Sequence, residues 1–219
     1  MWPRNKNGFT LLEVMIAAAI LALIVSMLYI AFASSVKTME IGTAGGDMYR
    51  KAGVILNRMT QEISCAQIPT EEEKSSTEYA FIGEEKIEDK MPRNTLTFIS
   101  SARPLQGPSR GSKQVSYYIV PDPATDKPCL MMREDTTPDF SNSVEQGGKG
   151  ILLAEGIEGL DFTYYDSHGT EYKRWDTTIP LFAGKLPQLV RVSLLFKDDK
   201  GEAFSLTTMV NIPLTGTGD

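Results

Sequence analysis

One acidic residue lies at the entrance of the most hydrophobic stretch of the chain. Glu13 follows Gly8 by five positions, and the twenty residues from Val14 to Ala33 contain no charged side chain. A helix of about 20 residues rises about 30 Å, which is the thickness of the hydrocarbon core of a bilayer. A carboxylate at the edge of hydrocarbon is costly unless it is protonated or paired with a cation. Glu13 is therefore the first candidate for a functional residue.

The other reactive residue types form no recognisable catalytic, cofactor or metal site. The single histidine, His168, lies in residues 165–169, a sequence typical of a turn, and no Gly-x-Ser-x-Gly elbow accompanies it. There is no phosphate-binding glycine loop and no spaced set of zinc ligands. Acidic residues cluster in 122–126 and 198–202, but neither segment has an EF-hand pattern. The sequence predicts no enzyme, no cofactor and no metal ligand.

Residues 8–13, Gly-Phe-Thr-Leu-Leu-Glu, resemble the processing site shared by type IV prepilins and type II secretion pseudopilins. In that superfamily a membrane peptidase cleaves after the glycine and methylates the new amino-terminal phenylalanine. The glutamate five residues into the mature chain guides subunit assembly. The resemblance therefore implies prepilin peptidase cleavage between Gly8 and Phe9, N-methylation of Phe9, and an assembly role for Glu13.

The charges that such processing creates suit an assembly role. Cleavage would leave a cationic amine on Phe9, about one helical turn before Glu13. In an apolar filament core, Glu13 of an incoming subunit could pair with the Phe9 amine of its neighbour and so fix the axial register. The alternative is an uncleaved signal anchor with a stray acid. However, a conventional secretory signal has its small-residue cleavage site after the apolar region, not before it.

The charge distribution predicts the orientation of the chain. The protein has 22 basic and 28 acidic residues, a net charge of −6, and Arg4 and Lys6 precede the apolar span. By the positive-inside rule we expect the amino terminus in the cytoplasm. The resemblance implies a single-pass protein of the bacterial inner membrane, whose carboxy-terminal domain then lies in the periplasm. Removal of residues 1–8 would leave 20 basic residues, a net charge of −8. Such an acidic domain argues against nucleic acid as a partner.

The two cysteines allow two interpretations. Cys65 and Cys129 are the only cysteines in the chain. The periplasm would permit a disulfide between them. They could equally be two buried small hydrophobic residues, because spacing in sequence does not give the distance between side chains.

A long helix is expected to carry the amino-terminal motif. No proline occurs between Pro3 and Pro69, so one helix can run through the apolar span and beyond it. Apolar residues then recur at spacings of three and four, at Met48, Ala52, Ile55, Met59, Ile63 and Ala66. Polar residues fall mostly on the opposite side, at Arg50, Lys51, Asn57, Arg58, Gln61 and Glu62. Gly42, Gly45 and Gly46 predict a bend or a melted turn between the two halves.

After Pro69 the apolar residues alternate with period two, which predicts half-buried antiparallel strands. The alternating sets are Leu96 and Phe98; Val115, Tyr117 and Ile119; Leu160, Phe162 and Tyr164; Val190, Val192, Leu194 and Phe196; and Phe204, Leu206, Thr208, Val210 and Ile212. Residues 197–202 are expected to form a hairpin turn. Polar loops are expected at 101–113, 121–128 and 134–150.

The predicted fold class is α+β, a pilin-like arrangement in which a long amino-terminal helix packs on an antiparallel β-rich domain. The expected divisions are a leader peptide at 1–8, the transmembrane half of the helix at 9–33, its amphipathic half at 34–68 and a β-rich periplasmic domain at 69–219.

Residues 156–166 and 186–192, with Trp175 between them, resemble the carboxy-terminal half of the minor pseudopilin J of type II secretion. This resemblance implies a structural subunit that joins I-like and K-like pseudopilins at the pseudopilus tip, which is needed for protein export across the outer membrane. Similar stretches occur in W-type minor pilins, which prime type IV pilus assembly, so that function is one alternative. A membrane-anchored binding module exported by the prepilin route is another.

Overall fold

The computed structural model describes residues 11–68, 80–104, 111–136, 140, 149–197 and 203–213. Within these ranges the side chains of 33–48 and of Lys149 are not described. Gly8 and Phe9 of the processing motif, and the predicted turn at 198–202, lie outside the described residues. The chain forms two compact units, Met1–Tyr49 and Arg50–Asp219.

Helix α1 runs from Leu11 to Ser64 and accounts for 54 residues. It continues through Gly42, Gly45 and Gly46, so the melted turn predicted as one alternative at these glycines is wrong. Each glycine costs a helix about 1 kcal/mol relative to alanine. Because a helix already nucleated on both sides propagates cooperatively, scattered glycines do not interrupt it.

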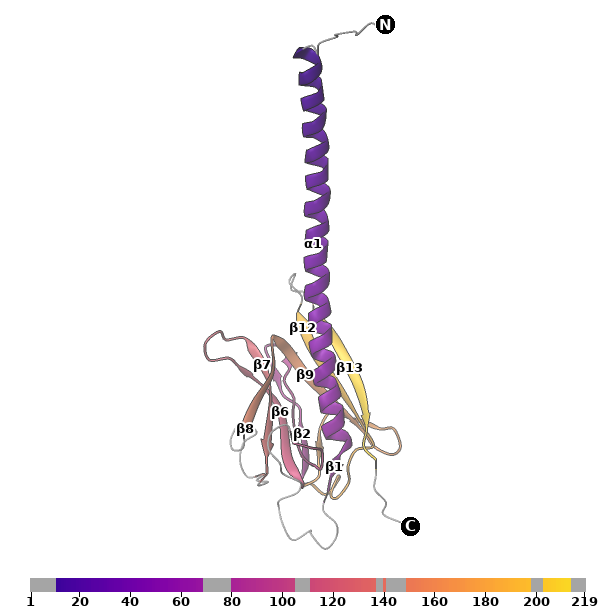
Figure 1. The fold of residues 1–219 in the computed structure, drawn as a ribbon. Helices are drawn as coiled ribbons and strands as arrows, with labels where there is room; N and C mark the ends of the chain where they lie inside the picture. The colour runs from indigo at the N-terminus through magenta and orange to yellow at the C-terminus, as the bar shows by residue number, and fades with distance from the viewer. Residues whose placement is uncertain are drawn as a thin grey trace, which may run out of the picture. The chain divides into compact units, whose positions relative to one another are not determined.

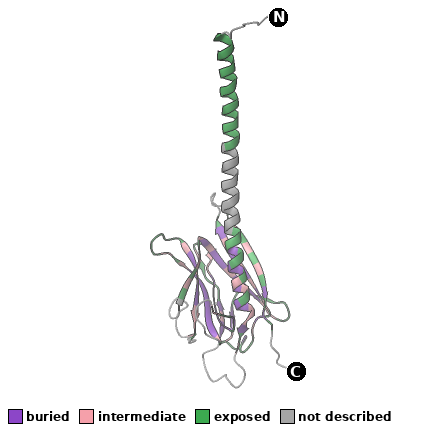
Figure 2. Ribbon diagram, viewed as in Figure 1, coloured by how far each residue is buried: buried purple, intermediate pink, exposed green. Residues whose placement is uncertain are grey.

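The part of α1 in the first unit is apolar and exposed. Residues Leu11–Phe32 form a 22-residue stretch that is long and apolar enough to cross a membrane, and none of it is buried within the protein. Figure 2 shows this stretch as exposed along its whole length. Exposed leucine, isoleucine and valine side chains over six turns of helix require a surrounding other than water.

The second unit contains the β-structure, and every pair of named strands in it is antiparallel. The strands are β1 (Ala66–Gln67), β2 (Phe81–Glu84), β3 (Ile87–Glu88), β4 (Met91–Pro92), β5 (Thr95–Ser100), β6 (Lys113–Pro121), β7 (Pro128–Asp135), β8 (Lys149–Glu155), β9 (Ile157–Tyr165), β10 (Glu171–Tyr172), β11 (Trp175–Asp176), β12 (Leu189–Lys197) and β13 (Ala203–Asn211).

These strands form two main sheets (Figure 1). The larger sheet has the order β11-β2-β5-β6-β7-β8, and β1 pairs with β5 beside it. The smaller sheet has the order β10-β9-β12-β13. Strands β3 and β4 form a separate two-stranded ribbon. The result is the predicted α+β fold, with an amino-terminal helix and an antiparallel β-rich domain.

The predicted alternation located five strands correctly, namely β5, β6, β9, β12 and β13. The last two form the predicted hairpin, with Lys197 opposite Ala203. Strands β7 and β8 were missed, because their ends fall inside the predicted loops 121–128 and 134–150. Strand β7 lies between β6 and β8 and buries residues on both faces, so it shows no clean alternation in sequence.

The two sheets meet in an aromatic core. Phe81 of β2 packs edge-on against Tyr164 of β9, with ring centroids 6.0 Å apart. Phe98 and Tyr117 extend the same cluster within the larger sheet. Gly83 is required at this junction, since a Cβ there would overlap the Tyr164 hydroxyl. The core therefore joins strands that are far apart in sequence.

Helix α1 contributes the predicted apolar stripe to this unit. The stripe residues of the described part are buried, namely Ala52, Ile55, Met59, Ile63 and Ala66. The Met48 side chain lies outside the described residues. The helix ends at Ser64, a few residues before the predicted boundary at 68, and Ala66–Gln67 pair with β5 instead.

Candidate functional site

Glu13 lies in the first turn of α1 and is exposed on the surface of the apolar span. A negative charge in the first turn of a helix interacts favourably with the helix dipole. The carboxylate is therefore placed where a group outside this chain can reach it. Gly8 and Phe9 are outside the described residues, so the processing roles of these two residues and the pairing role of Glu13 remain predictions.

A second acidic residue of α1 has the opposite surroundings. Glu62 was expected on the polar side of the helix, but its side chain is fully buried against the larger sheet. Lys113 Nζ lies 2.8 Å from Glu62 Oε1, and Ser100 Oγ lies 2.8 Å from Glu62 Oε2. Arg58, one turn earlier on the helix, also donates to this carboxylate. The placement of Glu62 on the outer side was thus a wrong prediction.

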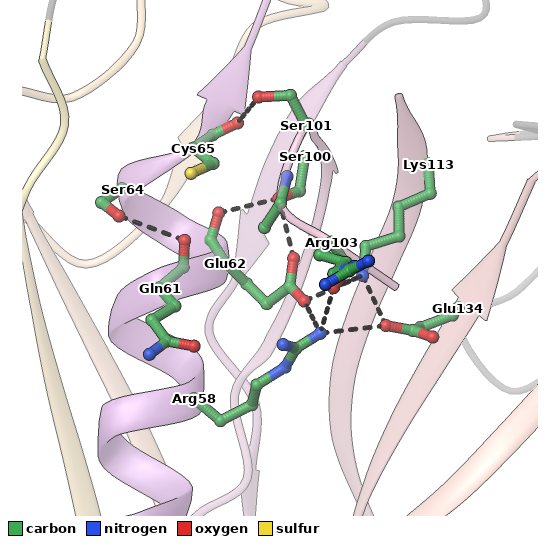
Figure 3. A network of polar contacts seen from close by, with 11 residues as sticks. Arg58, Gln61, Glu62, Ser64, Cys65, Ser100, Ser101, Arg103, Lys113 and Glu134 are labelled. Atoms are coloured by element: carbon green, nitrogen blue, oxygen red, sulfur yellow. Dashed lines mark hydrogen bonds and ion pairs between the residues drawn. The ribbon is translucent and has the colours of Figure 1, made fainter. Parts of the chain in front are cut away.

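Lys113 and Glu134 complete a buried network of two acids and two bases (Figure 3). The Lys113 side chain is only 1% exposed, and its Nζ lies 2.5 Å from Glu134 Oε1. Arg58 Nη2 lies 3.3 Å from the same Glu134 oxygen. The two acids and two bases balance each other in charge, and the pair of Glu62 and Lys113 is almost completely removed from water.

No local pattern indicates this network, because Lys113 and Glu134 lie at the ends of the predicted loops 101–113 and 134–150. In the structure Lys113 begins β6 and Glu134 belongs to β7, where it pairs with Val115. A charged residue at a strand end looks the same in sequence whether it faces water or a buried partner. Only the register of β6 on β7 brings the two side chains together.

The network also holds the end of the helix. Ser100 Oγ lies 3.0 Å from the backbone oxygen of Glu62, and the Ser101 amide donates to the backbone oxygen of Cys65 at 3.0 Å. The last carbonyl groups of a helix have no partner within it. Here the end of β5 supplies these partners, so the carboxy-terminal turn of α1 is fixed on the larger sheet.

Tyr117 lies close to this network. Burial raises the pKa of the Tyr117 hydroxyl well above its usual range, and the negative charge of Glu62 raises it further. The hydroxyl has no hydrogen-bond partner among the described residues. The group is therefore neutral and serves as part of the packing around the network.

The cysteines are both free thiols, Cys129 buried and Cys65 partly buried. Cys65 lies beside the end of β5 that pairs with Lys113, whereas Cys129 pairs with Val120 at the other end of β6. Seven residues of strand separate Lys113 from Val120, which is about 23 Å. A disulfide requires Cα atoms within about 7 Å. The disulfide alternative is therefore wrong for this fold.

The remaining reactive residues form no cluster in the described part of the chain. His168 lies in an exposed turn, where its backbone amide donates to the Asp166 carboxylate. Asp122 accepts hydrogen bonds from Thr125 within its own turn. Among the described residues no three His, Cys, Asp or Glu side chains come together as metal ligands.

The fold and the exposed span together define a class: a protein with an amino-terminal apolar helix that fits a membrane anchor, and an antiparallel β-rich domain, as in pilins. Residues 3–29 match the family model of the prokaryotic N-terminal methylation motif. Residues 31–201 match the model of type II secretion system (T2SS) protein J. No curated protein gives a significant match to the chain.

The second match covers more than half of the 219 residues, and the chain belongs to the type II secretion system protein J family. It is thus a minor pseudopilin of type II secretion. The family is a structural one, whose members assemble with other pseudopilins.

Proposed function

We propose that this pseudopilin is stored in the inner membrane by its apolar helix and enters the pseudopilus after cleavage between Gly8 and Phe9. Glu13 then pairs with the N-methylated amine of Phe9 in a neighbouring subunit. The observation that supports this proposal best is the exposed apolar stretch Leu11–Phe32, which carries Glu13 in its first turn and overlaps the match to the methylation motif, residues 3–29.

The membrane topology follows from the same stretch. Its 22 residues rise about 33 Å as a helix, enough to cross the hydrocarbon core. Arg4 and Lys6 on its amino-terminal side favour a cytoplasmic amino terminus. Residues 1–8 are then the leader, 9–33 the membrane segment, 34–68 the remainder of the helix, and 69–219 the periplasmic domain.

The particular assembly is a tip complex with I-like and K-like pseudopilins, which starts the filament that helps to export folded proteins across the outer membrane. The match to protein J over residues 31–201 supports this choice over a W-type minor pilin. In this role the β-rich domain makes the contacts with other subunits. The buried network of Arg58, Glu62, Lys113 and Glu134 holds that domain on the carboxy-terminal turns of α1 in one orientation.

The test replaces Glu13 in cells that contain their own secretion system. Glu13→Leu is expected to leave membrane insertion and amino-terminal processing intact, because leucine suits the bilayer and the cleavage site is unchanged. Secretion and co-purification with other pseudopilins should fall about tenfold or more, since an incoming subunit loses its pairing charge. Intact mass of the purified protein reports whether it begins at N-methyl-Phe9.

Ser26→Leu is the matched control. Ser26 lies in the same span, and its hydroxyl donates to the Ala22 carbonyl of its own helix, so this change should not affect assembly. Normal secretion by Glu13→Leu would disprove the register role of Glu13. A chain that begins at Met1 would disprove the processing route. Binding of a secreted substrate without any pseudopilin would favour the binding-module alternative.

A further inference from the structure

The main sheets expose four edges, and three of them are protected against pairing with another strand. Strands β10 and β11 have two residues each. Strand β8 is longer, but its pairing with β7 contains a register shift, and it begins with Lys149 and ends with Glu155. Very short strands, bulges and charged residues are the usual devices that prevent edge-to-edge association.

Strand β13 has none of these devices. Its nine residues, Ala203–Asn211, contain no charged residue and no proline. It pairs with β12 in regular register over its full length, from Leu189 opposite Asn211 to Lys197 opposite Ala203. Among the described strands only β12 pairs with it. Within the described part of the chain, its other edge therefore presents backbone N–H and C=O groups in a long, regular row.

The side chains of β13 are also less buried than those of the strands inside the sheet. Residues on the exposed face include Ser205 and Met209, the latter 56% exposed. On the other face, Phe204, Leu206 and Thr208 are only partly buried, and Val210 alone is fully buried. In contrast, Val190, Val192 and Leu194 of β12 are completely buried. A further strand beside β13 would cover its partly exposed apolar side chains.

We infer that the outer edge of β13 binds an extended segment of a neighbouring pseudopilin, which adds a strand to the smaller sheet. Only an extended backbone can satisfy a row of alternating donors and acceptors. The incoming segment should be uncharged, free of proline at its pairing positions, and apolar on the side of Phe204 and Leu206. This inference rests on the proposed function, which supplies the partner.

Net charge favours another pseudopilin over a second copy of this chain. The chain has a net charge of −6, so two copies repel each other over their whole surfaces. A less acidic partner avoids this repulsion and still meets the backbone of β13. The strand that pairs with β13 thus belongs to a different pseudopilin.

The first measurement is crosslinking in cells that express the full chain with the other pseudopilins of its secretion system. Ser205 is replaced by p-benzoylphenylalanine, which needs no change to the backbone, and the products are identified by mass spectrometry. A crosslink to an extended segment of another pseudopilin is expected. Crosslinks only to a second copy of this chain, or none to a pseudopilin, would overturn the inference.

The second measurement uses charge. Ser205→Lys places a charged side chain on the exposed face of β13, where it should hinder pairing with another strand. Co-purification with other pseudopilins should therefore fall about tenfold. Leu152→Lys places the same charge on β8, at a side chain that is 50% exposed, and should have no such effect. Thermal unfolding confirms that both variants fold. Equal co-purification of the two variants would contradict the inference.

The wild-type chain separates this inference from the proposed function. If wild-type protein co-purifies with the other pseudopilins and Ser205→Lys does so equally, only the role of β13 is wrong. If wild-type protein does not co-purify with them, the proposed assembly itself is wrong, and the inference falls with it.

Discussion

The two ends of helix α1 each carry one acidic residue next to apolar surface, and their surroundings differ completely. Glu13 is exposed on a stretch that is itself exposed. Glu62 is fully buried and is bound by Lys113, Arg58 and Ser100 of the same chain. Both positions need compensation for a charge outside water. The fold supplies it for Glu62, and we propose that assembly adds a partner from a neighbouring subunit for Glu13.

The difference separates two kinds of residue that look alike in sequence. A carboxylate with all its partners inside the subunit fixes one conformation of that subunit. A carboxylate on an exposed apolar helix can fix the position of one subunit relative to another. Mutations should therefore change stability at Glu62 and assembly at Glu13.

The largest effect on stability is expected when the buried network loses a charge. Lys113→Met removes the base whose ammonium group pairs with both Glu62 and Glu134. The free energy of unfolding should fall by about 3–5 kcal/mol, because breaking a buried pair leaves an uncompensated charge. Denaturant unfolding of the full chain in detergent measures this change.

Lys86→Met is the control, since Lys86 forms an exposed pair with Glu88 at 2.8 Å. Removal of an exposed pair should change stability by at most about 1 kcal/mol. The double variant Lys113→Met with Glu62→Leu should recover much of the lost stability, because both unpaired groups are then apolar. Similar losses for Lys113→Met and Lys86→Met would mean that the network does not stabilise the fold.

Glutamine in place of each acid tests the difference between Glu62 and Glu13. Glu62→Gln should lower the free energy of unfolding by about 2 kcal/mol, because the hydrogen bonds from Lys113 and Ser100 lose their charged acceptor. Glu13→Gln should leave stability unchanged and reduce co-purification with other pseudopilins. Loss of assembly in both variants without loss of stability in Glu62→Gln would remove the proposed distinction.

The smallest effect concerns the neutral neighbour of the network. Tyr117→Phe should stabilise the protein by about 1 kcal/mol, because it removes a buried hydroxyl that has no partner in the described part of the chain. Destabilisation by this variant would show that the hydroxyl does make a hydrogen bond, for example to a buried water.

Tyr117→Phe should also change how the free energy of unfolding depends on pH, because the pKa of the Tyr117 hydroxyl is raised in the folded protein. Because the folded pKa lies above the unfolded one, the stability linked to this hydroxyl is fully present below about pH 10 and is lost as pH rises further. The free energy of unfolding of Tyr117→Phe should therefore fall less steeply than that of wild type above this pH. Denaturant unfolding at pH 8 and at about pH 10.5 compares the two slopes.

Elements with a strong local pattern were predictable. Residue type and spacing predict the surroundings of the side chains in three kinds of element. These are the apolar span, the stripe from Ala52 to Ala66, and the alternating strands β5, β6, β9, β12 and β13. Local pattern did not predict β7, because this strand buries residues on both faces. It also predicted an interruption at the glycines of α1, because a local pattern does not include the cooperativity of a long helix. These failures share one cause, since the deciding interactions lie outside the local window.

The sequence by itself determined the apolar span, the match to the methylation motif, the position of Glu13 at the start of the span and the α+β class, because each depends on residues close together in the chain. Only the tertiary structure decided that Glu62 is buried, that Lys113 pairs with both Glu62 and Glu134, and that Cys65 and Cys129 stay apart. The pairing of β5 with β6 and of β6 with β7 sets those distances. Register between strands brings distant residues together, and no local pattern of charge or hydrophobicity specifies it.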